Sequence, residues 1–336
     1  FICYTSATIT SFNPTYRVFS GLVLHSYTVA VTLGGSEGAC ILHVVPMFHA
    51  NAWGGPFVGM LAGCKQVFPG RQVLNMEKLC RIIADEKVTF TAGVPTIWMM
   101  LYDYLEKGGW HDFSSLKGIY SGGAPCPRYL MEGLNEKYNF PIVQAYGMTE
   151  TTPLVLAALP KSYMVDWPID KLYDVRSSAG LLATGLEMKL VNDAGEEVKW
   201  DGKEWGEVLL KGPWIAKEYY KDPERSRPAF EGGWLHTGDV RTIDEEGYVR
   251  LVDRTKDLVK SGGEWISSVD LEDAIMAHPK VLEAAVIGVP HPKWQERPLA
   301  CVVPVPGETV TGDELKEFLQ DKVKVSWWIP DEFVFL

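Results

Sequence analysis

The sequence predicts an α/β protein built from parallel-sheet layers, a small antiparallel β-barrel and a small mobile α+β domain at the C-terminal end. Three observations predict this class. The first half alternates short apolar runs with helical periodicity, the middle carries short strands between turn residues, and the tail combines capped helices with an apolar strand. We expect a large α/β part at 1–178, a small β subdomain at 179–253, a hinge at 254–258 and a truncated tail domain at 259–336.

The α/β part is expected to contain a parallel sheet. The predicted strands are 41–45, 66–68, 88–93, 118–123 and 141–147, and the helices between them are 76–83, 95–105 and 127–138. Right-handed crossovers place such helices on both faces of the sheet. Ligands bind beyond the carboxyl ends of parallel strands. The loops after Val45, Tyr120 and Val143 are therefore where a ligand site is expected.

The second half changes its pattern at about residue 179. The runs 186–191, 206–212 and 247–253 are separated by turn residues and predict a small antiparallel sheet or barrel. In the tail, Ser267 with Asp270 begins a helix, 281–289 forms a strand, and Thr311 with Glu314 caps another helix.

Composition limits the possible functions. The chain has 32 Lys and Arg against 43 Asp and Glu, a net charge of −11, which argues against a general nucleic-acid binder. The six cysteines form no C-x-x-C pair and fit buried, reduced thiols of a cytoplasmic protein. The start of the chain has no leader pattern. The uncharged stretch 38–64 is interrupted by proline, histidine and glycine, so we interpret it as a buried strand, a loop and a buried helix rather than a membrane span.

Five motifs carry the chemical information. They are PMFHANAWG (46–54), SGGAP (121–125), QAYGMTE (144–150), GGWLHTGD (232–239) and DRTKDLVKSGGEWIS (253–267). Tyr146 followed by Gly147 lets a purine stack while the backbone approaches closely. Thr149 and Glu150 offer the hard oxygen ligands that Mg²⁺ prefers. The alternative is a tight turn with a solvated glutamate.

The carboxylate of Asp239 ends an extended run, where it could accept both hydroxyls of a ribose, and the guanidinium of Arg254 could donate to the same sugar. The alternatives are a turn-capping carboxylate and a surface ion pair.

Taken in order, the five motifs resemble the adenylate-forming (AMP-binding) acyl-CoA synthetase superfamily. Within it the sequence is most similar to medium- and long-chain fatty acid–CoA ligases and methylmercaptopropionate–CoA ligases, from about Gly35 to the last residue. The resemblance implies an ATP-dependent acid–CoA ligase that works through an acyl-adenylate. Its ligands would be a carboxylic acid, ATP or AMP, Mg²⁺ and CoA, and a homodimer is one implied assembly. A non-catalytic nucleotide-binding remnant, an adenylation domain that loads a carrier protein and a luciferase-like relative are the alternatives.

The resemblance also implies residue roles. Nucleotide binding falls to Thr5, Ser6, Gly122, Gly123, Ala124, Pro125, Gln144, Ala145, Tyr146, Gly147, Met148, Thr149, Asp239 and Arg254. The implied catalytic residues are His49, Thr149 and Glu150, with Glu150 as the metal ligand. Acyl binding falls to His49, Trp53 and Gly147, with Trp53 as a gate or, alternatively, an ordinary core residue. Ser261, Gly262, Gly263, Glu264 and Trp265 would line the CoA tunnel, or form a plain hairpin turn, and Asp257 would be the hinge.

The sequence departs from the family near its start. The family's phosphate loop reads Tyr-Thr-Ser-Gly-Thr-Thr-Gly-x-Pro-Lys-Gly and is followed by Val-Leu-His. Here Tyr4–Ser6 and Val23–His25 match the two ends, but 7–22 lack the loop's glycines and lysine. Since a phosphate cradle needs inward backbone N–H groups, we expect weak β- and γ-phosphate binding. We hypothesise a compensated reading-frame error, which resequencing of the DNA tests. Lys322 and Lys324 do not fit the family's catalytic-lysine motif, so impaired activity is expected.

Overall fold

A computed structural model describes residues 2–5, 13–16, 19–254, 258–261, 264–323 and 325–336. The chain divides into two compact units. The first contains 1–204, 208–237 and 243–250, and the second contains 205–207, 238–242 and 251–336. The mixed α/β class predicted from the sequence is confirmed.

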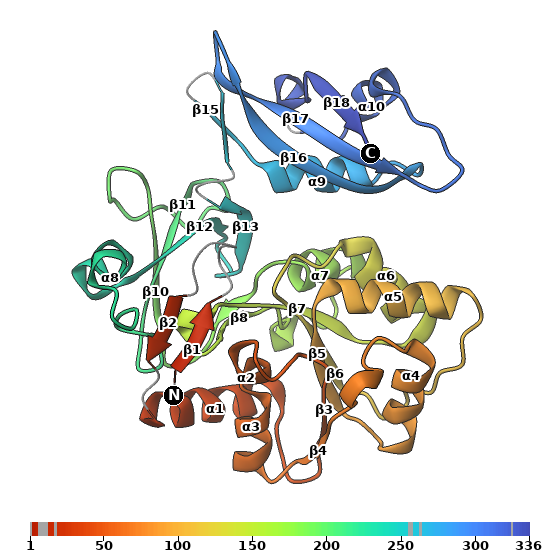
Figure 1. Cartoon of the computed structure of the whole chain (residues 1–336), viewed down its shortest axis with the longest axis vertical. Coiled ribbons are helices and arrows are strands. Elements are labelled where there is room, and N and C mark those ends of the chain that lie inside the picture. The colour runs from red at the N-terminus through yellow and green to blue at the C-terminus, as the bar shows by residue number, and fades with distance from the viewer. Residues whose placement is uncertain (1, 6–12, 17–18, 255–257, 262–263, 324) are drawn as a thin grey trace. The chain divides into compact units, whose positions relative to one another are not determined.

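The first unit is built on a seven-stranded sheet (Figure 1). Its order is β4 (Lys65–Val67), β3 (Cys40–His43), β5 (Phe90–Gly93), β6 (Gly118–Ser121), β7 (Ile142–Gly147), β8 (Leu154–Ala157) and β9 (Leu181–Leu182). The pairs from β4 to β7 are parallel, as predicted, and the β7–β8 and β8–β9 pairs are antiparallel. The last two strands were not predicted from the sequence.

Helices cover both faces of this sheet (Figure 1). On one face lie α4 (Met76–Asp85), α5 (Pro95–Glu106), α6 (Arg128–Tyr138) and α7 (Ile169–Arg176), and on the other lie α1 (Phe19–Leu33), α2 (Ala50–Trp53) and α3 (Gly55–Ala62). The first group encloses the main core, in which Trp98 and Phe140 are fully buried. Helix α4 forms where its buried residues recur three and four positions apart, and Asn75 caps it by accepting the Lys78 N–H at 3.1 Å.

A hairpin precedes α1. Strand β1 (Ile2–Thr5) pairs antiparallel with β2 (Asn13–Tyr16). Strand β1 contacts α2 and the 3₁₀ turn η2 (Thr149–Thr151). The backbone of the predicted Tyr4-Thr5 motif therefore lies beside the Thr149 turn. Ser6 lies outside the described residues, and only the backbone of Thr5 is described.

A second sheet follows the chain order: β10 (Glu187–Val191), β11 (Trp205–Lys211), β12 (Leu235–Ile243) and β13 (Val249–Arg254). The connection from β12 to β13 is only 244–248, which closes an antiparallel hairpin because parallel strands need a much longer crossover. This confirms the antiparallel sheet predicted for the middle of the chain. In the chain, helix α8 (Pro223–Ala229) and the turn η4 (Glu231–Gly233) connect β11 to β12. Two more short 3₁₀ turns, η1 (Gly70–Gln72) and η3 (Ser162–Met164), belong to the first unit.

The tail of the second unit is a small α+β fold, as predicted. Its elements are β14 (Val259–Ser261), β15 (Glu264–Ile266), α9 (Ser268–Met276), β16 (Val281–His291), β17 (Gln295–Pro304), α10 (Gly312–Leu319), η5 (Ser326–Trp328) and β18 (Glu332–Phe335). The sheet order is β15–β14–β17–β16, and β18 runs parallel to β17. Both predicted helix caps are present, because Ser267 accepts the Asp270 N–H at 3.0 Å and Thr311 accepts the Glu314 N–H at 3.2 Å.

The described thiols fit the prediction of reduced, mostly buried cysteines. Cys40, Cys64, Cys80 and Cys126 are buried and unpaired, and burial raises the pKa of Cys80 and of Cys126 to about 12. In the described part of the chain, no helix combines the length and the apolar character that a bilayer crossing needs.

Candidate active site

A cavity of about 150 Å³ lies on the sheet face that α1 and α3 cover. Strand alternation builds its floor. Ile41 and His43 point to this face, whereas Leu42 and Val44 belong to the core on the opposite face. Most of its lining is apolar and comes from several elements: Val29, Leu33, Ile41, Val45, Val58, Phe90, Ala92, Tyr120, Ala145 and Leu154. This is the environment that an acyl chain or an aromatic ring needs.

The end of β7 provides one wall of the cavity. Tyr146, Gly147, Met148 and Thr149 all line it, and the register of the β7–β8 pair shifts between Tyr146 and Gly147. A Cβ atom at Gly147 would lie 2.0 Å from the Pro153 carbonyl oxygen. Glycine is therefore required here by the close approach of two backbone segments, independently of any ligand.

The glycine pair after β6 faces Trp53. A Cβ atom at Gly122 would lie 2.9 Å from the Ala145 carbonyl oxygen and 3.3 Å from Cη2 of the Trp53 indole, and one at Gly123 would lie 3.6 Å from Cζ2. The indole thus rests against the backbone of the predicted nucleotide-binding loop. Both motifs and Tyr146 border the same cavity.

The side chain of Gln144 ties two motifs together. Its Oε1 accepts the Cys126 N–H at 2.9 Å, and its Nε2 donates to the Ala124 carbonyl at 3.1 Å. Gln144 is buried on β7, so these bonds attach the 122–126 loop to the strand that ends in Tyr146. The side-chain amide of Gln144 therefore holds the 122–126 loop in position.

The turn that carries Trp53 is left-handed, which the sequence did not predict. Ala50, Asn51, Ala52 and Trp53 have φ between 45° and 56°, so α2 is a single left-handed turn, followed by Gly54 at φ 76°. His49 and Trp53 are therefore not placed on one face by a right-handed helical turn. Both residues nevertheless line the cavity. Left-handed helical backbone costs roughly 1–2 kcal/mol per residue, so packing must hold this turn in place.

Glu150 is a buried carboxylate next to Thr149. It is 4% exposed, its Oε1 accepts the Tyr219 O–H at 2.9 Å, and its carbonyl accepts the Ala216 N–H at 2.8 Å. Burial, and then the adjacent Glu150 charge, raise the pKa of Tyr219, so the phenol is a hydrogen-bond donor at neutral pH.

The donor set at η2 fits Mg²⁺. Glu150 supplies a carboxylate and the adjacent Thr149 a hydroxyl, and Mg²⁺ commonly binds through one or two carboxylates together with substrate phosphates. Among the described residues, no three His, Cys, Asp or Glu side chains gather into a cluster. An ion held at Glu150 would therefore complete its shell with phosphate oxygens and water.

A buried imidazole in the cavity was not anticipated. Nε2 of His43 lies 2.9 Å from Oε1 of Gln66, and the ring stacks on Phe68 with centroids 4.6 Å apart. Burial lowers the pKa of His43, which keeps the ring neutral at neutral pH. The sequence signal for its position was the alternation along 41–45.

The predicted ribose residue Asp239 lies on β12, in the second compact unit. Its side chain is 14% exposed, with an oxygen 3.6 Å from Nη2 of Arg241. Gly238 has φ 70°, and its N–H donates to Glu207 at 2.9 Å. The side chain of Arg254 lies outside the described residues.

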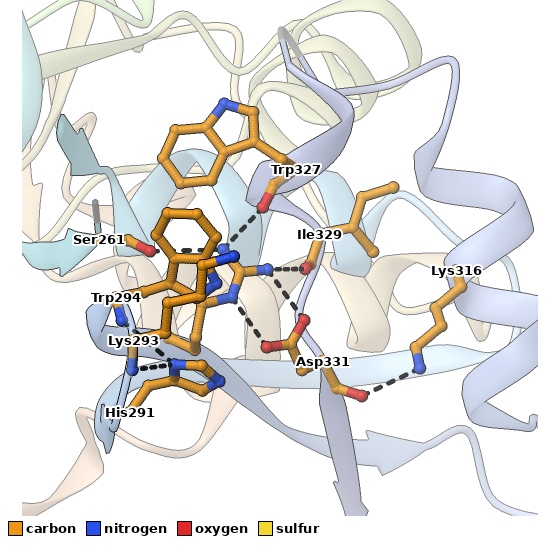
Figure 2. A network of polar contacts seen from close by, with 9 residues as sticks. Ser261, His291, Lys293, Trp294, Lys316, Trp327, Ile329 and Asp331 are labelled. Atoms are coloured by element: carbon orange, nitrogen blue, oxygen red, sulfur yellow. Dashed lines mark hydrogen bonds and ion pairs between the residues drawn. The ribbon is translucent and has the colours of Figure 1, made fainter. Parts of the chain in front are cut away.

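The predicted CoA segment is described in part. Gly262, Gly263 and Asp257 lie outside the described residues, and Glu264 and Trp265 are described by their backbone alone. Ser261 is buried at the end of β14. Its Oγ is one of several acceptors around a single guanidinium, that of Arg297 (Figure 2).

Arg297 organises the edge of β17. It is 8% exposed and donates to both oxygens of Asp331 at 2.8 and 2.9 Å, to the carbonyls of Trp327 and Ile329 at 2.8 and 3.2 Å, and to Ser261 at 3.5 Å. Strand β16 occupies one edge of β17 throughout, so β14 and β18 share the other. Arg297 fills the interval between them, and no sequence motif marked it.

Fold and cavity together define an α/β protein with a cavity that reaches the carboxyl ends of parallel strands, the place where ligands bind in such sheets. Residues 2–220 match the AMP-binding enzyme family, and residues 270–336 match the AMP-binding enzyme C-terminal domain. The chain belongs to the AMP-binding enzyme family.

Relatives with assigned activities are similar over nearly the whole chain. A long-chain-fatty-acid–CoA ligase of Thermus thermophilus is 47% identical over 94% of this chain and 58% of its own length. A 3-methylmercaptopropionyl-CoA ligase of Ruegeria lacuscaerulensis is 40% identical over 100% of this chain and 62% of its own length. The chain therefore spans about three fifths of these relatives.

Solved structures give the same result. The o-succinylbenzoate CoA synthetase of Bacillus subtilis, in complex with its acyl-adenylate intermediate, superposes with a TM-score of 0.86 at 30% identity, covering 100% of this chain and 65% of that one. The same enzyme in complex with ATP and a magnesium ion gives a TM-score of 0.85 at 29% identity, covering 100% and 66%.

Proposed function

We propose that this chain carries the nucleotide- and acid-binding core of an ATP-dependent acid–CoA ligase acting on a fatty or related carboxylic acid. The observation that carries the proposal is the single cavity that joins the Tyr146–Thr149 turn to the apolar side chains of Val29, Leu33 and Phe90. One end suits a purine and a phosphate, and the other suits a hydrocarbon chain. The activities of the relatives and the acyl-adenylate complex of a similar structure support the same reaction.

The reaction has two half-reactions. First, a carboxylate oxygen attacks the α-phosphorus of ATP, and the bond to the β,γ-phosphates breaks, which releases pyrophosphate. The CoA thiol then attacks the acyl carbon, loses its proton, and AMP leaves with the electrons of the broken C–O bond. The protein contributes positioning and charge stabilisation rather than a covalent intermediate.

Each residue has a role in this scheme. The Tyr146 ring stacks on adenine, and the Gly122–Gly123 backbone borders the base from the other side of the cavity. The Thr149 hydroxyl donates to the α-phosphate, His49 orients the acid carboxylate, and Glu150 holds Mg²⁺. The ion, when bound, neutralises charge on the phosphate oxygens. Asp239 and Arg254 bind the ribose, 261–265 bind CoA, and Asp257 is the hinge between the two half-reactions.

Nucleotide binding can be tested separately from turnover. Because 7–22 lack the glycines and lysine of the family's phosphate loop, ATP should stabilise the protein no more than AMP, whereas a non-hydrolysable acyl-adenylate analogue should stabilise it most. Thermal-shift titration measures all three. No shift with AMP or with the analogue would refute the nucleotide site and favour a remnant without one.

Turnover is tested by pyrophosphate release with a panel of carboxylic acids, followed by thioester formation with CoA. We expect slow release that depends on acids with an apolar chain. Release without any thioester, with transfer to a carrier protein instead, would favour the adenylation-domain alternative. AMP binding with no release for any acid would favour a non-catalytic nucleotide-binding protein.

Trp53 is the proposed gate of the acyl compartment. Its indole lies against Gly122 and Gly123 and lines the same cavity as the apolar side chains. Trp53→Ala should therefore broaden the range of acids that bind and weaken the dependence of acid binding on ATP. Fluorescent fatty-acid binding with and without ATP measures both. An unchanged chain preference and ATP dependence would refute gating and leave core packing as its role.

We also retain the cytoplasmic location and a homodimer as predictions for the whole protein. Cell fractionation tests the first and light scattering the second.

A further inference from the structure

Tyr219 connects the Thr149–Glu150 turn to the segment that follows β11. The segment makes three hydrogen bonds with the turn. Thr152 Oγ1 donates to the Trp214 carbonyl at 2.8 Å, the Ala216 N–H donates to the Glu150 carbonyl at 2.8 Å, and the Tyr219 O–H donates to Glu150 Oε1 at 2.9 Å. The first involves the Thr152 side chain, the second the backbone of Glu150, and the third the Glu150 carboxylate itself.

Tyr219 is held at both its backbone and its ring. Its N–H donates to the Ser226 hydroxyl at 2.9 Å, and its ring meets Phe230 edge to face, with centroids 5.5 Å apart. Tyr219 also forms an isolated antiparallel bridge with Thr15 on β2. Thr15, Glu150 and Tyr219 all belong to the first compact unit. The phenol oxygen is therefore placed by packing that is independent of the carboxylate it contacts.

The bridge between Tyr219 and Thr15 also links Glu150 to the start of the chain. Strand β2 pairs with β1, and β1 contacts η2. Tyr219 consequently contacts both the hairpin at the start of the chain and the Glu150 carboxylate. A buried glutamate can rotate about its side-chain torsions, and a donor on one oxygen fixes which oxygen faces the ligand.

We propose that Tyr219 is a positioning residue for metal-nucleotide binding: its O–H orients the Glu150 carboxylate toward the Mg²⁺ that accompanies the phosphates. This inference rests on the proposed function, in which Glu150 is the metal ligand. Groups that orient a metal ligand typically change metal affinity by ten-fold or more when they are removed. Tyr219 is not itself a ligand and touches no reacting atom.

The test uses Tyr219→Phe, which removes the hydroxyl and retains the ring that packs on Phe230. At saturating ATP, Mg²⁺ or Mn²⁺ is titrated, and the change in intrinsic tryptophan fluorescence gives the midpoint. We expect the midpoint to rise about ten-fold in Tyr219→Phe. AMP binding measured with EDTA present should be unchanged, because it involves no metal. Tyr220→Phe, the adjacent tyrosine, is the matched control and should leave both quantities unchanged.

A purely structural role would give a different result. In that case Tyr219→Phe would weaken AMP binding with EDTA as much as metal-dependent binding, or would leave the metal midpoint unchanged, and either result overturns the inference. If the variant is also less stable, the double variant with Glu150→Gln decides. The ten-fold effect of Tyr219→Phe should vanish in that background, and its persistence overturns the inference.

The two proposals fail in distinguishable ways. A wild-type protein whose nucleotide binding shows no dependence on Mg²⁺ or Mn²⁺ removes the metal role of Glu150 and this inference with it. A wild-type protein with metal-dependent binding and an unchanged Tyr219→Phe midpoint removes only the role of Tyr219.

Discussion

Replacement of Gly147 by alanine tests whether the turn that carries Tyr146 is fixed by its own backbone. The new Cβ atom would lie 2.0 Å from the Pro153 carbonyl oxygen, so the two must separate by at least 1.0 Å to reach the 3.0 Å limit that real Cβ atoms keep. That oxygen accepts the Met148 N–H at 3.2 Å and also the Thr151 hydroxyl. Separation therefore breaks bonds that hold the turn.

The expected loss of stability follows from these contacts. Two hydrogen bonds contribute about 1 kcal/mol each, and forcing an atom into a packed site costs about 2 kcal/mol. Gly147→Ala should thus lower the free energy of unfolding by about 4 kcal/mol. The affinity for AMP should fall as well, because Tyr146 moves with the turn.

Urea denaturation followed by circular dichroism measures the loss, and two glycines serve as controls. Gly38 has no neighbour within 4 Å of a built Cβ atom and no positive φ, so Gly38→Ala should be neutral. Gly195 is equally open but has φ 79°, so Gly195→Ala should cost about 1 kcal/mol from backbone strain alone. A Gly147→Ala protein as stable as Gly38→Ala, with wild-type AMP affinity, would refute the reasoning.

Two further predictions concern buried side chains. Gln144→Leu removes the acceptor of the Cys126 N–H, so it should lower the free energy of unfolding by about 2 kcal/mol and weaken AMP binding. Urea denaturation measures the first effect and calorimetry the second. An AMP affinity equal to that of the wild type contradicts a role of Gln144 in holding the loop. Arg297→Met leaves Asp331 and two carbonyls without their donor and should destabilise the second unit by about 3 kcal/mol at pH 7, as urea denaturation would measure. Hydrogen bonds from Arg297 lower the pKa of Asp331. The stabilisation that the ionised Asp331 contributes is therefore present above its unfolded pKa of about 4 and is lost as the pH falls through the lower folded value. The difference in unfolding free energy between the wild type and Asp331→Asn should shrink over that range, and a difference that stays constant to pH 2 argues against this contribution.

The sequence predicted the elements whose signals are local. Five parallel strands, the α4 periodicity and the caps at Ser267 and Thr311 all appear in the structure, because apolar spacing and capping chemistry act within a few residues. The short strands β8 and β9 carry no such signal. Leu154–Ala157 is a brief apolar run that pairing with β7 makes a strand.

Site contacts that join distant segments could not be predicted from residue patterns. Tyr219 and Glu150 are 69 positions apart, and Arg297 and Asp331 are 34 apart. Each pair is brought together by strand order and by the path of the connecting loops, which no local pattern specifies. The lining of the cavity could be predicted from the sequence only in part. Alternation places Ile41 and His43 on one face, but the helices that enclose that face are fixed by tertiary packing.

The left-handed turn at 50–53 restricts which amino acids this segment can carry. Valine, isoleucine and threonine are disfavoured at positive φ, because a branched Cβ collides with the adjacent backbone. The Ala-Asn-Ala-Trp composition is thus partly a requirement of chirality rather than of the ligand. Divergence of substrate preference among homologues at these positions would have to proceed through residues that tolerate the mirror-image conformation, or through a change in the path of the main chain.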